Sequence, residues 1–303
     1  LSKKIRDKTK RSQHILTNMF YMIEINSSSV QELHKLFGKD ANISNADFLD
    51  NKKKWEKDLG QTQFDIVVGN PPFQVSKSNK YEGSVGNRTL WDKFLDKTFK
   101  EDLIKSKGYL AFINPSNWRR PEHRIYTLLT RENTLKYLHI YGKKDGQTLL
   151  GAQTRFDLYI VQEGSANKTQ KTHIIDEKNK KHTLDVSSWP FLPNYSYTKI
   201  KSIMVPVTKG IPVIFSAGDY DARKLSKKRT KNHRFSVVHN ITQKGLGIRF
   251  AKEKKTSHIG VPKVLLNFNE RQYPYNDYRG EYGMSQLTFG IPIKSKKEGE
   301  QWV

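Results

Sequence analysis

The sequence predicts an α/β domain followed by a smaller domain that is rich in β-structure. In the first half of the chain, short apolar runs typical of buried strands alternate with segments that have helical spacing. This alternation stops near residue 164, where a polar, lysine-rich stretch begins. The chain also has 303 residues, which exceeds one average domain. We therefore expect two domains, each with its own core.

The elements of the α/β domain follow from apolar periodicity. We expect helices at residues 29–37 and 89–99, the first of which ends at Gly38, a common helix stop. The last predicted strand alternates apolar and polar residues, which favours antiparallel pairing. The predicted strands are residues 19–25, 41–48, 64–69, 108–113, 135–140 and 155–162.

The predicted domain limits come from the change in character after Glu163. Residues 1–165 form the expected α/β domain, and residues 166–208 form a connector that includes Pro190 and Pro193. From residue 209 to residue 303, strand-like runs alternate with Gly, Pro and Lys clusters. This pattern predicts a mixed α+β or β-rich domain.

The charge balance points to a polyanionic partner. Lys and Arg total 54 against 30 Asp and Glu, a formal net charge of +24. Such an excess favours nucleic acid, although a basic protein in a ribosome-like assembly would show it too. Charge alone leaves DNA, RNA and an anionic membrane open.

Composition also excludes several kinds of chemistry. The chain has no cysteine, so disulfides, thiolate metal sites and cysteine nucleophiles are excluded. It has no apolar run approaching the ~20 residues that a membrane span needs. We expect a soluble, cytoplasmic protein that has no membrane partner and no metal.

The most informative motif is Asn70-Pro71-Pro72-Phe73, at the end of the predicted strand 64–69. Ligands of open α/β sheets bind at the carboxyl ends of strands. Proline fixes φ and has no N–H, so the Asn70 amide oxygen and the Pro71 carbonyl are free to accept the two hydrogens of an exocyclic amine. Phe73 could stack on an extruded base. The alternative is a simple turn after a strand.

These residues resemble the amino-group methyltransferases of restriction-modification systems, whose hallmark is Asp/Asn-Pro-Pro-aromatic after a strand. The resemblance covers residues 19–163. It implies a Rossmann-like, S-adenosylmethionine-dependent fold in which Glu24 holds the cofactor ribose, Asp47 contacts its adenine and Phe48 stacks beside it. As isolated acids, Glu24 and Asp47 would more often be solvated strand ends.

The resemblance also implies a Gly-rich loop and strand before Glu24, and the chain has only a basic, helix-like stretch there. The chain begins with Leu1 rather than Met. We therefore expect that the chain is cut from a longer one, or that a partner chain supplies the first strand.

The basic residues of the second half are candidates for gripping double-stranded DNA. A charge run is usually a solvated loop, but in a DNA-binding enzyme it more often contacts phosphates. Lys244 and Arg249 flank a Gly pair and are weaker candidates for groove contact. The run consists of Arg223, Lys227, Lys228, Arg229, Lys231 and Arg234.

The resemblance implies a site-specific DNA methyltransferase that acts on adenine N6 of a flipped base without a covalent intermediate. Because related loops bind planar amines generally, RNA guanine-N2, protein glutamine-N5 and cytosine-N4 methyltransferases stay open. A non-catalytic DNA-binding specificity fragment is the alternative from another class. A separate basic domain favours a nucleic acid over a protein substrate.

Overall fold

The computed structural model divides the chain into two compact units, Leu1–Ser202 and Ile203–Val303, which are described separately. It describes residues 3–50, 52–74, 89–121, 123–164, 170–206, 209–216, 218–268 and 272–303. None of the helices in these ranges has the length and apolar character needed to cross a membrane.

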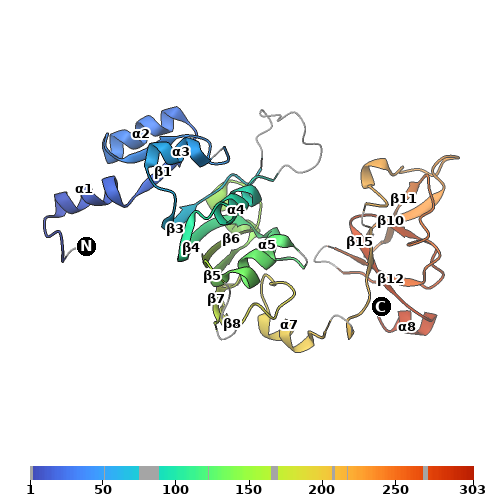
Figure 1. Cartoon of the computed structure of the whole chain (residues 1–303). Coiled ribbons are helices and arrows are strands. Elements are labelled where there is room, and N and C mark those ends of the chain that lie inside the picture. Colours follow the sequence, from blue (N-terminus) through green and yellow to red (C-terminus); the bar gives the residue numbers. More distant parts are fainter. Residues whose placement is uncertain are drawn as a thin grey trace. The chain divides into compact units, whose positions relative to one another are not determined.

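Unit 1 alternates strands and helices in its first half, as the sequence predicts (Figure 1). The predicted strands are all confirmed, with shifts at their ends, and both predicted helices are present. Its elements in chain order are α1 (Lys8–Asn18), β1 (Tyr21–Glu24), α2 (Ser27–Phe37), β2 (Asn42–Asn45), α3 (Lys52–Leu59), β3 (Phe64–Gly69), α4 (Trp91–Lys100), β4 (Ile104–Pro115), α5 (Arg124–Thr127), β5 (Thr134–Tyr141), α6 (Lys143–Leu150), β6 (Phe156–Gln162), β7 (Thr172–Ile175), β8 (Lys181–Leu184) and α7 (Tyr197–Ile203).

The main sheet of unit 1 has six strands in the order β3-β4-β6-β5-β7-β8. Strands β3 and β4 are parallel, as are β5 and β7, whereas β6 runs antiparallel to both of its neighbours, as predicted. The carboxyl ends of β3, β4, β5 and β7 therefore lie at one edge of the sheet, which we call the carboxyl edge. Ligands of α/β sheets gather at such an edge.

One face of this sheet is a packed core. Leu110 and Phe112 of β4 point to the same face as their β6 partners Val161 and Tyr159, and all four are buried. Figure 1 shows α4 and α5 over this side. The Trp118 ring contacts both Tyr159 and Tyr126 of α5, at centroid distances of 5.6 and 6.3 Å, which seals the core at the carboxyl edge.

The opposite face is apolar but open. Ile66 and Val68 of β3 alternate with the core-facing residues and are 63% and 65% exposed. Tyr109, which pairs with Ile66, is 38% exposed on the same face. Strand β3 also lies at the end of the sheet, so its outer edge has no strand partner among the described residues. Both faces of a parallel α/β sheet are normally covered.

Strands β1 and β2 form a separate parallel pair. Helix α3 packs against this pair through buried Trp55 and Leu59, in a cluster that also contains Leu103, just before β4. Tyr21 of β1 contacts Phe64 of β3 at a ring-centroid distance of 5.5 Å. Side-chain packing therefore joins the pair to the edge of the main sheet that β3 occupies.

Unit 2 is rich in β-structure, as the sequence predicts. One sheet has the order β11-β10-β14 and the other the order β13-β12-β15-β9. Its elements are β9 (Ile214–Phe215), β10 (Phe235–Thr242), β11 (Gly245–Ala251), β12 (Lys263–Asn267), β13 (Tyr275–Asp277), β14 (Gly283–Met284), β15 (Thr288–Pro292) and α8 (Lys296–Glu300). Val238, Ile241, Leu265 and Met284 form a core that includes residues of both sheets.

A buried ion pair fixes the loops of unit 2. The Lys263 ammonium is fully buried and donates to Asp277 Oδ2 at 2.8 Å and to the carbonyls of His258 and Val261. Asp277 accepts in turn from the backbone amides of Glu281 and Tyr282. Each charge therefore has hydrogen-bonding partners, as buried charges require.

The division of the chain differs from the predicted domain limits. Residues 166–208 were expected to form a connector, yet β7 and β8 lie in that segment and extend the main sheet beside β5. The compact units meet between Ser202 and Ile203 rather than near residue 165. The prediction failed because the lysines of this segment mask two short strands, whose exposed positions tolerate charge.

A second buried ion pair, Arg119 with Asp157, locks the end of the main sheet. The Arg119 guanidinium, which is 3% exposed, donates to Asp157 Oδ2 at 2.8 Å, to the Leu192 carbonyl and to Asn194. It therefore ties β6 to the segment that follows β8. Burial raises the pKa of Asp157, and the charge of Arg119 opposes that rise.

We predict that Arg119→Met destabilises unit 1 by about 3–5 kcal/mol, because it leaves the Asp157 carboxylate buried without a counter-charge. Urea unfolding followed by tryptophan fluorescence measures this loss. Replacing both partners, in Arg119→Met with Asp157→Leu, should cost less than the single change. Without Arg119 the pKa of Asp157 rises further, so the deficit should shrink as pH falls and the carboxyl binds a proton. A deficit that grows at low pH would contradict this account.

Candidate active site and nucleic-acid interface

The segment Asn70-Pro71-Pro72-Phe73 leaves β3 at the carboxyl edge of the main sheet. Asn70 is exposed, Pro71 is buried and Phe73 is half-buried. The strand ends in Gly69, where a Cβ atom would lie 3.1 Å from the Phe112 ring, so a larger residue would push against the core. A buried proline thus holds the segment, and the amide of Asn70 faces outward.

Helix α4 anchors this segment. The Leu90 amide, just before α4, donates to the Phe73 carbonyl at 3.3 Å. Trp91, the first residue of α4, is buried. Residues 75–88, between this segment and α4, lie outside the described residues.

Asn114 brings a further polar group to the same edge. It lies near the end of β4, is fully buried, and its Oδ1 accepts a hydrogen bond from the Tyr159 hydroxyl. Its Nδ2 has no hydrogen-bond partner within the described part of the chain. A buried amide nitrogen without a partner is uncommon and marks this point as strained or functional.

Glu24 and Asp47 lie together at the carboxyl ends of β1 and β2. The parallel register pairs Glu24 with Asn45, and the Ala46 amide donates to the Glu24 carbonyl at 3.1 Å. Glu24 Oε1 accepts from the Asn26 amide at 2.7 Å, and Asp47 Oδ1 from the Leu49 amide at 2.8 Å. The second oxygen of each carboxylate has no partner in the described ranges, so both can accept from a ligand.

Phe48, the predicted stacking partner of the cofactor adenine, is packed by protein rings. It stacks on Phe94 of α4 at 5.1 Å with nearly parallel planes, and on Trp55 at 6.3 Å. The Lys97 ammonium lies 5.8 Å from its ring centroid. Phe48 thus takes part in the core between α3 and α4, and its role towards a cofactor stays a prediction.

The predicted cofactor residues and the Asn70 segment meet through α4. At its start α4 holds Phe73 through Leu90, and along its length it packs on Phe48 and donates from Lys97 to the Asp50 carbonyl. The three predicted groups, at Glu24, at Asp47 and at Asn70, therefore belong to one connected framework within unit 1.

His123 lies beside this framework, and no sequence pattern had pointed to it. Its ring stacks on Trp91 at 6.0 Å, and its Nδ1 accepts from the Ile125 amide at 3.2 Å. Neutral His123 therefore carries its proton on Nε2. Burial lowers its pKa, and the charges of Arg120 and Arg124 lower it further.

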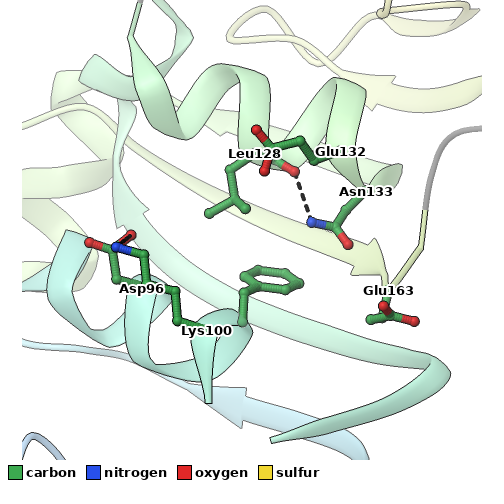
Figure 2. Close-up of a pocket in the computed structure, with 7 residues that line it drawn as sticks. Asp96, Lys100, Leu128, Glu132, Asn133 and Glu163 are labelled. Carbon is green, nitrogen blue, oxygen red and sulfur yellow. Dashed lines mark hydrogen bonds and ion pairs between the residues drawn. The ribbon is translucent and has the colours of Figure 1, made fainter. Parts of the chain in front are cut away.

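A cavity of about 280 Å³ lies at the other edge of the sheet (Figure 2). Its lining includes Glu163, whose amide donates to the carbonyl of Gly108 near the start of the paired part of β4. The other lining residues come from the end of α4 and from residues 128–133. The cavity is thus separate from the Asn70 segment. No group of three acidic, histidine or cysteine side chains in the described ranges is placed to hold a metal ion.

The predicted phosphate-binding run is docked on a strand of unit 2. Ser226, which lies within the run, and Phe250 of β11 exchange two backbone hydrogen bonds of 2.9 Å. The run therefore passes along the outer edge of β11 at this point. The side chains of Lys227, Lys228, Arg229, Lys231, Arg234 and Lys244 are all exposed. None of them forms an ion pair with an acid within the described chain.

Arg223 differs from the rest of the run. Its guanidinium donates to both carboxylate oxygens of Asp221, and Nη2 lies 2.7 Å from Oδ2. This contact lowers the pKa of Asp221 to about 2. The charge of Arg223 is therefore largely balanced within the chain, although its predicted contact with DNA is not tested by this geometry.

Residues 4–146 match a protein family described as "Eco57I restriction-modification methylase". The match covers just under half of the chain and includes Glu24, Asp47 and the segment Asn70–Phe73. A comparison with curated proteins found no match.

One solved structure that aligns with nearly the whole chain has a similar fold, and others align with it less closely. A nuclease-deletion mutant of the Type ISP restriction-modification enzyme LlaGI, in complex with a DNA substrate mimic, aligns with 96% of this chain and 43% of its own, at 8% identity and a TM-score of 0.51. A DrdV–DNA complex aligns with 93% and 43% at 8% identity and a TM-score of 0.48. The type I methyltransferase subunit from Streptococcus thermophilus aligns with 56% and 40% at 19% identity and a TM-score of 0.39. The chain spans less than half of each of these solved chains.

Proposed function

We propose that the chain is the catalytic and DNA-reading part of an S-adenosylmethionine-dependent DNA methyltransferase that modifies adenine N6 within a restriction-modification system. The observation that carries the proposal is the position of the Asn70 segment at the carboxyl edge of the sheet. There Asn70 is exposed, and the buried Pro71 next to it holds the segment in place. The family match over residues 4–146 supports the reaction class.

In this proposal the Asn70 segment positions the adenine amine for methyl transfer. The Asn70 amide oxygen and the Pro71 carbonyl accept the two hydrogens of the adenine amine, which favours a tetrahedral nitrogen with an available lone pair. Phe73 stacks on the flipped base and holds its plane. The lone pair held in this way would take the methyl group that the cofactor supplies, and the proton that N6 then releases would pass to water. Holding the reacting atoms in near-attack geometry supplies much of the rate.

The residues at the ends of β1 and β2 suit the cofactor. Its ribose offers two hydroxyl donors and its adenine an amine, and the Glu24 and Asp47 carboxylates each keep an oxygen that can accept. When bound, S-adenosylmethionine supplies an activated methyl group. The protein then has to hold the cofactor and the base in line.

A double-stranded DNA substrate agrees with the charge distribution. The net charge is +24, and the exposed cations beside β11 lack acidic partners within the described residues. Unpaired surface cations bind a polyphosphate by releasing its counterions. Target recognition is assigned to unit 2, which carries these cations.

A further β-strand completes the site in this proposal. Ile66 and Val68 are exposed on the open face, and β3 has a free edge among the described residues. An additional parallel strand at this edge, from another segment or from a partner chain, would pair with β3, and the helix that follows it would cover the face. A Gly-rich turn after that strand would bring backbone N–H groups to the cofactor, beside Glu24.

We predict that Asn70→Ala lowers the rate of N6-methyladenine formation at least about 100-fold, because one acceptor of the amine is lost where geometry controls the rate. The measurement is transfer of a labelled methyl group to duplex DNA, with the product nucleoside identified by mass spectrometry. Asn117→Ala, an amide change in the turn after β4, serves as the control. Unchanged methylation in Asn70→Ala, or methylcytosine as the product, would refute the assignment.

We also predict how affinity for duplex DNA depends on salt. Lys228→Ala should reduce the slope of log K against log salt by about 0.9, the value for one phosphate contact. Arg223→Ala removes the same charge, but Asp221 already balances it, so we expect a smaller change in slope. Fluorescence anisotropy over a salt series measures both slopes. Wild-type affinity that does not respond to salt would rule out the phosphate-gripping role.

A further inference from the structure

The hairpin of β10 and β11 carries polar groups that phosphate binding does not use. Its pairing places Val237 opposite Arg249 and Asn240 opposite Gly247, so these four residues share one face. Near the base of the hairpin this face packs on Tyr220 through Val237 and Ala251. Towards the tip it becomes polar and exposed, which core packing does not require.

A β-bulge interrupts β10 next to Asn240. The register of β10 shifts between Val238 and Asn240, which leaves His239 as the extra residue. Bulges re-aim side chains and are common beside functional sites. The His239 Nδ1 lies 3.2 Å from the Ser285 hydroxyl, which holds the ring. Burial lowers the pKa of His239, and the charge of Arg249 lowers it further.

Arg249 lies on this face of the hairpin, opposite Val237. It is half-buried, and it makes no hydrogen bond or ion pair with any described residue. Half-buried charges usually have a partner. An arginine guanidinium has five N–H donors in one plane, and two of them can donate to O6 and N7 of guanine. This pairing is the commonest specific contact in the major groove.

The absence of a side chain at Gly247 leaves room for the Asn240 side chain on this face. A Cβ atom at position 247 would lie 1.7 Å from Asn240 Oδ1, so only glycine lets this side chain lie across the hairpin face. Asn240 itself is exposed. An amide of this kind pairs with adenine through N6 and N7.

From this geometry we infer that the β10–β11 hairpin enters the DNA major groove and reads base edges with Arg249 and Asn240, Arg249 recognising a guanine. The inference rests on the proposed function, which supplies DNA as the partner. A two-stranded ribbon fits the width of the major groove. Ser226 lies at the outer edge of β11, and the exposed cations that follow it in the chain would then bind the phosphates that flank the groove.

The test is selection from a pool of random duplexes by the full chain, followed by sequencing of the bound fraction. We expect wild type to enrich a motif that contains a guanine. Arg249→Lys keeps the positive charge but removes the planar pair of N–H donors. It should reduce the preference for that guanine about 5- to 150-fold and leave the base preferences at other positions of the motif unchanged. Lys297→Ala, an exposed cation on α8, is the matched control and should leave the motif unchanged.

Gly247→Ala provides a second variant that removes no polar group. It displaces the Asn240 amide, so it should weaken one adenine preference and spare the guanine. An unchanged motif in Arg249→Lys, or binding by wild type without any base preference, would overturn the inference and leave DNA methylation standing. Failure of the wild-type chain to bind duplex DNA at all would overturn both the inference and the assignment of DNA as substrate.

Discussion

The hydrogen bond from the Leu90 amide to the Phe73 carbonyl joins the candidate catalytic segment to α4, and the rest of the site depends on that helix. The same helix packs on Phe48 and bonds the Asp50 carbonyl, so it also fixes the ends of β1 and β2. Because β1 and β2 share no backbone ladder with the main sheet, side-chain packing has to hold them in place. A cofactor held at Glu24 and a base held at Asn70 would therefore be positioned through α4.

Charge is distributed according to its role. Arg119 and Lys263 are buried, and each is paired with a carboxylate and with backbone carbonyls, so they contribute to the fold. The exposed cations that follow Ser226 have no such partners among the described residues, and these are the groups that a polyanion can use. Net charge predicts a polyanionic partner, while pairing separates the cations that could bind it from those that stabilise the protein.

Much of the first half could be predicted from the sequence. The apolar run Phe64–Gly69 and the prolines after it predict a strand and its end, although Ile66 and Val68 turn out to be exposed, and the order Glu24, Asp47, Asn70 follows the strands that carry them. Strands β7 and β8 were missed because they are short and lie in a polar, lysine-rich segment, and only their pairing beside β5 defines them. His123, the bulge at His239 and the contact of Asn240 with Gly247 depend on tertiary geometry and leave no periodic signal.

The central claim is that the carboxyl ends of β1 and β2 bind S-adenosylmethionine, and calorimetric titration of the cofactor into the chain tests it directly. The account predicts measurable binding that Glu24→Ala weakens by about tenfold or more, since a carboxylate hydrogen bond contributes about 1.5–3 kcal/mol. Glu32→Ala, an exposed acid on α2 that pairs with Lys35, should bind like wild type. Equal affinity in Glu24→Ala and wild type would contradict the role of Glu24, and a failure to bind even when the strand that pairs with β3 is supplied would contradict the cofactor site itself.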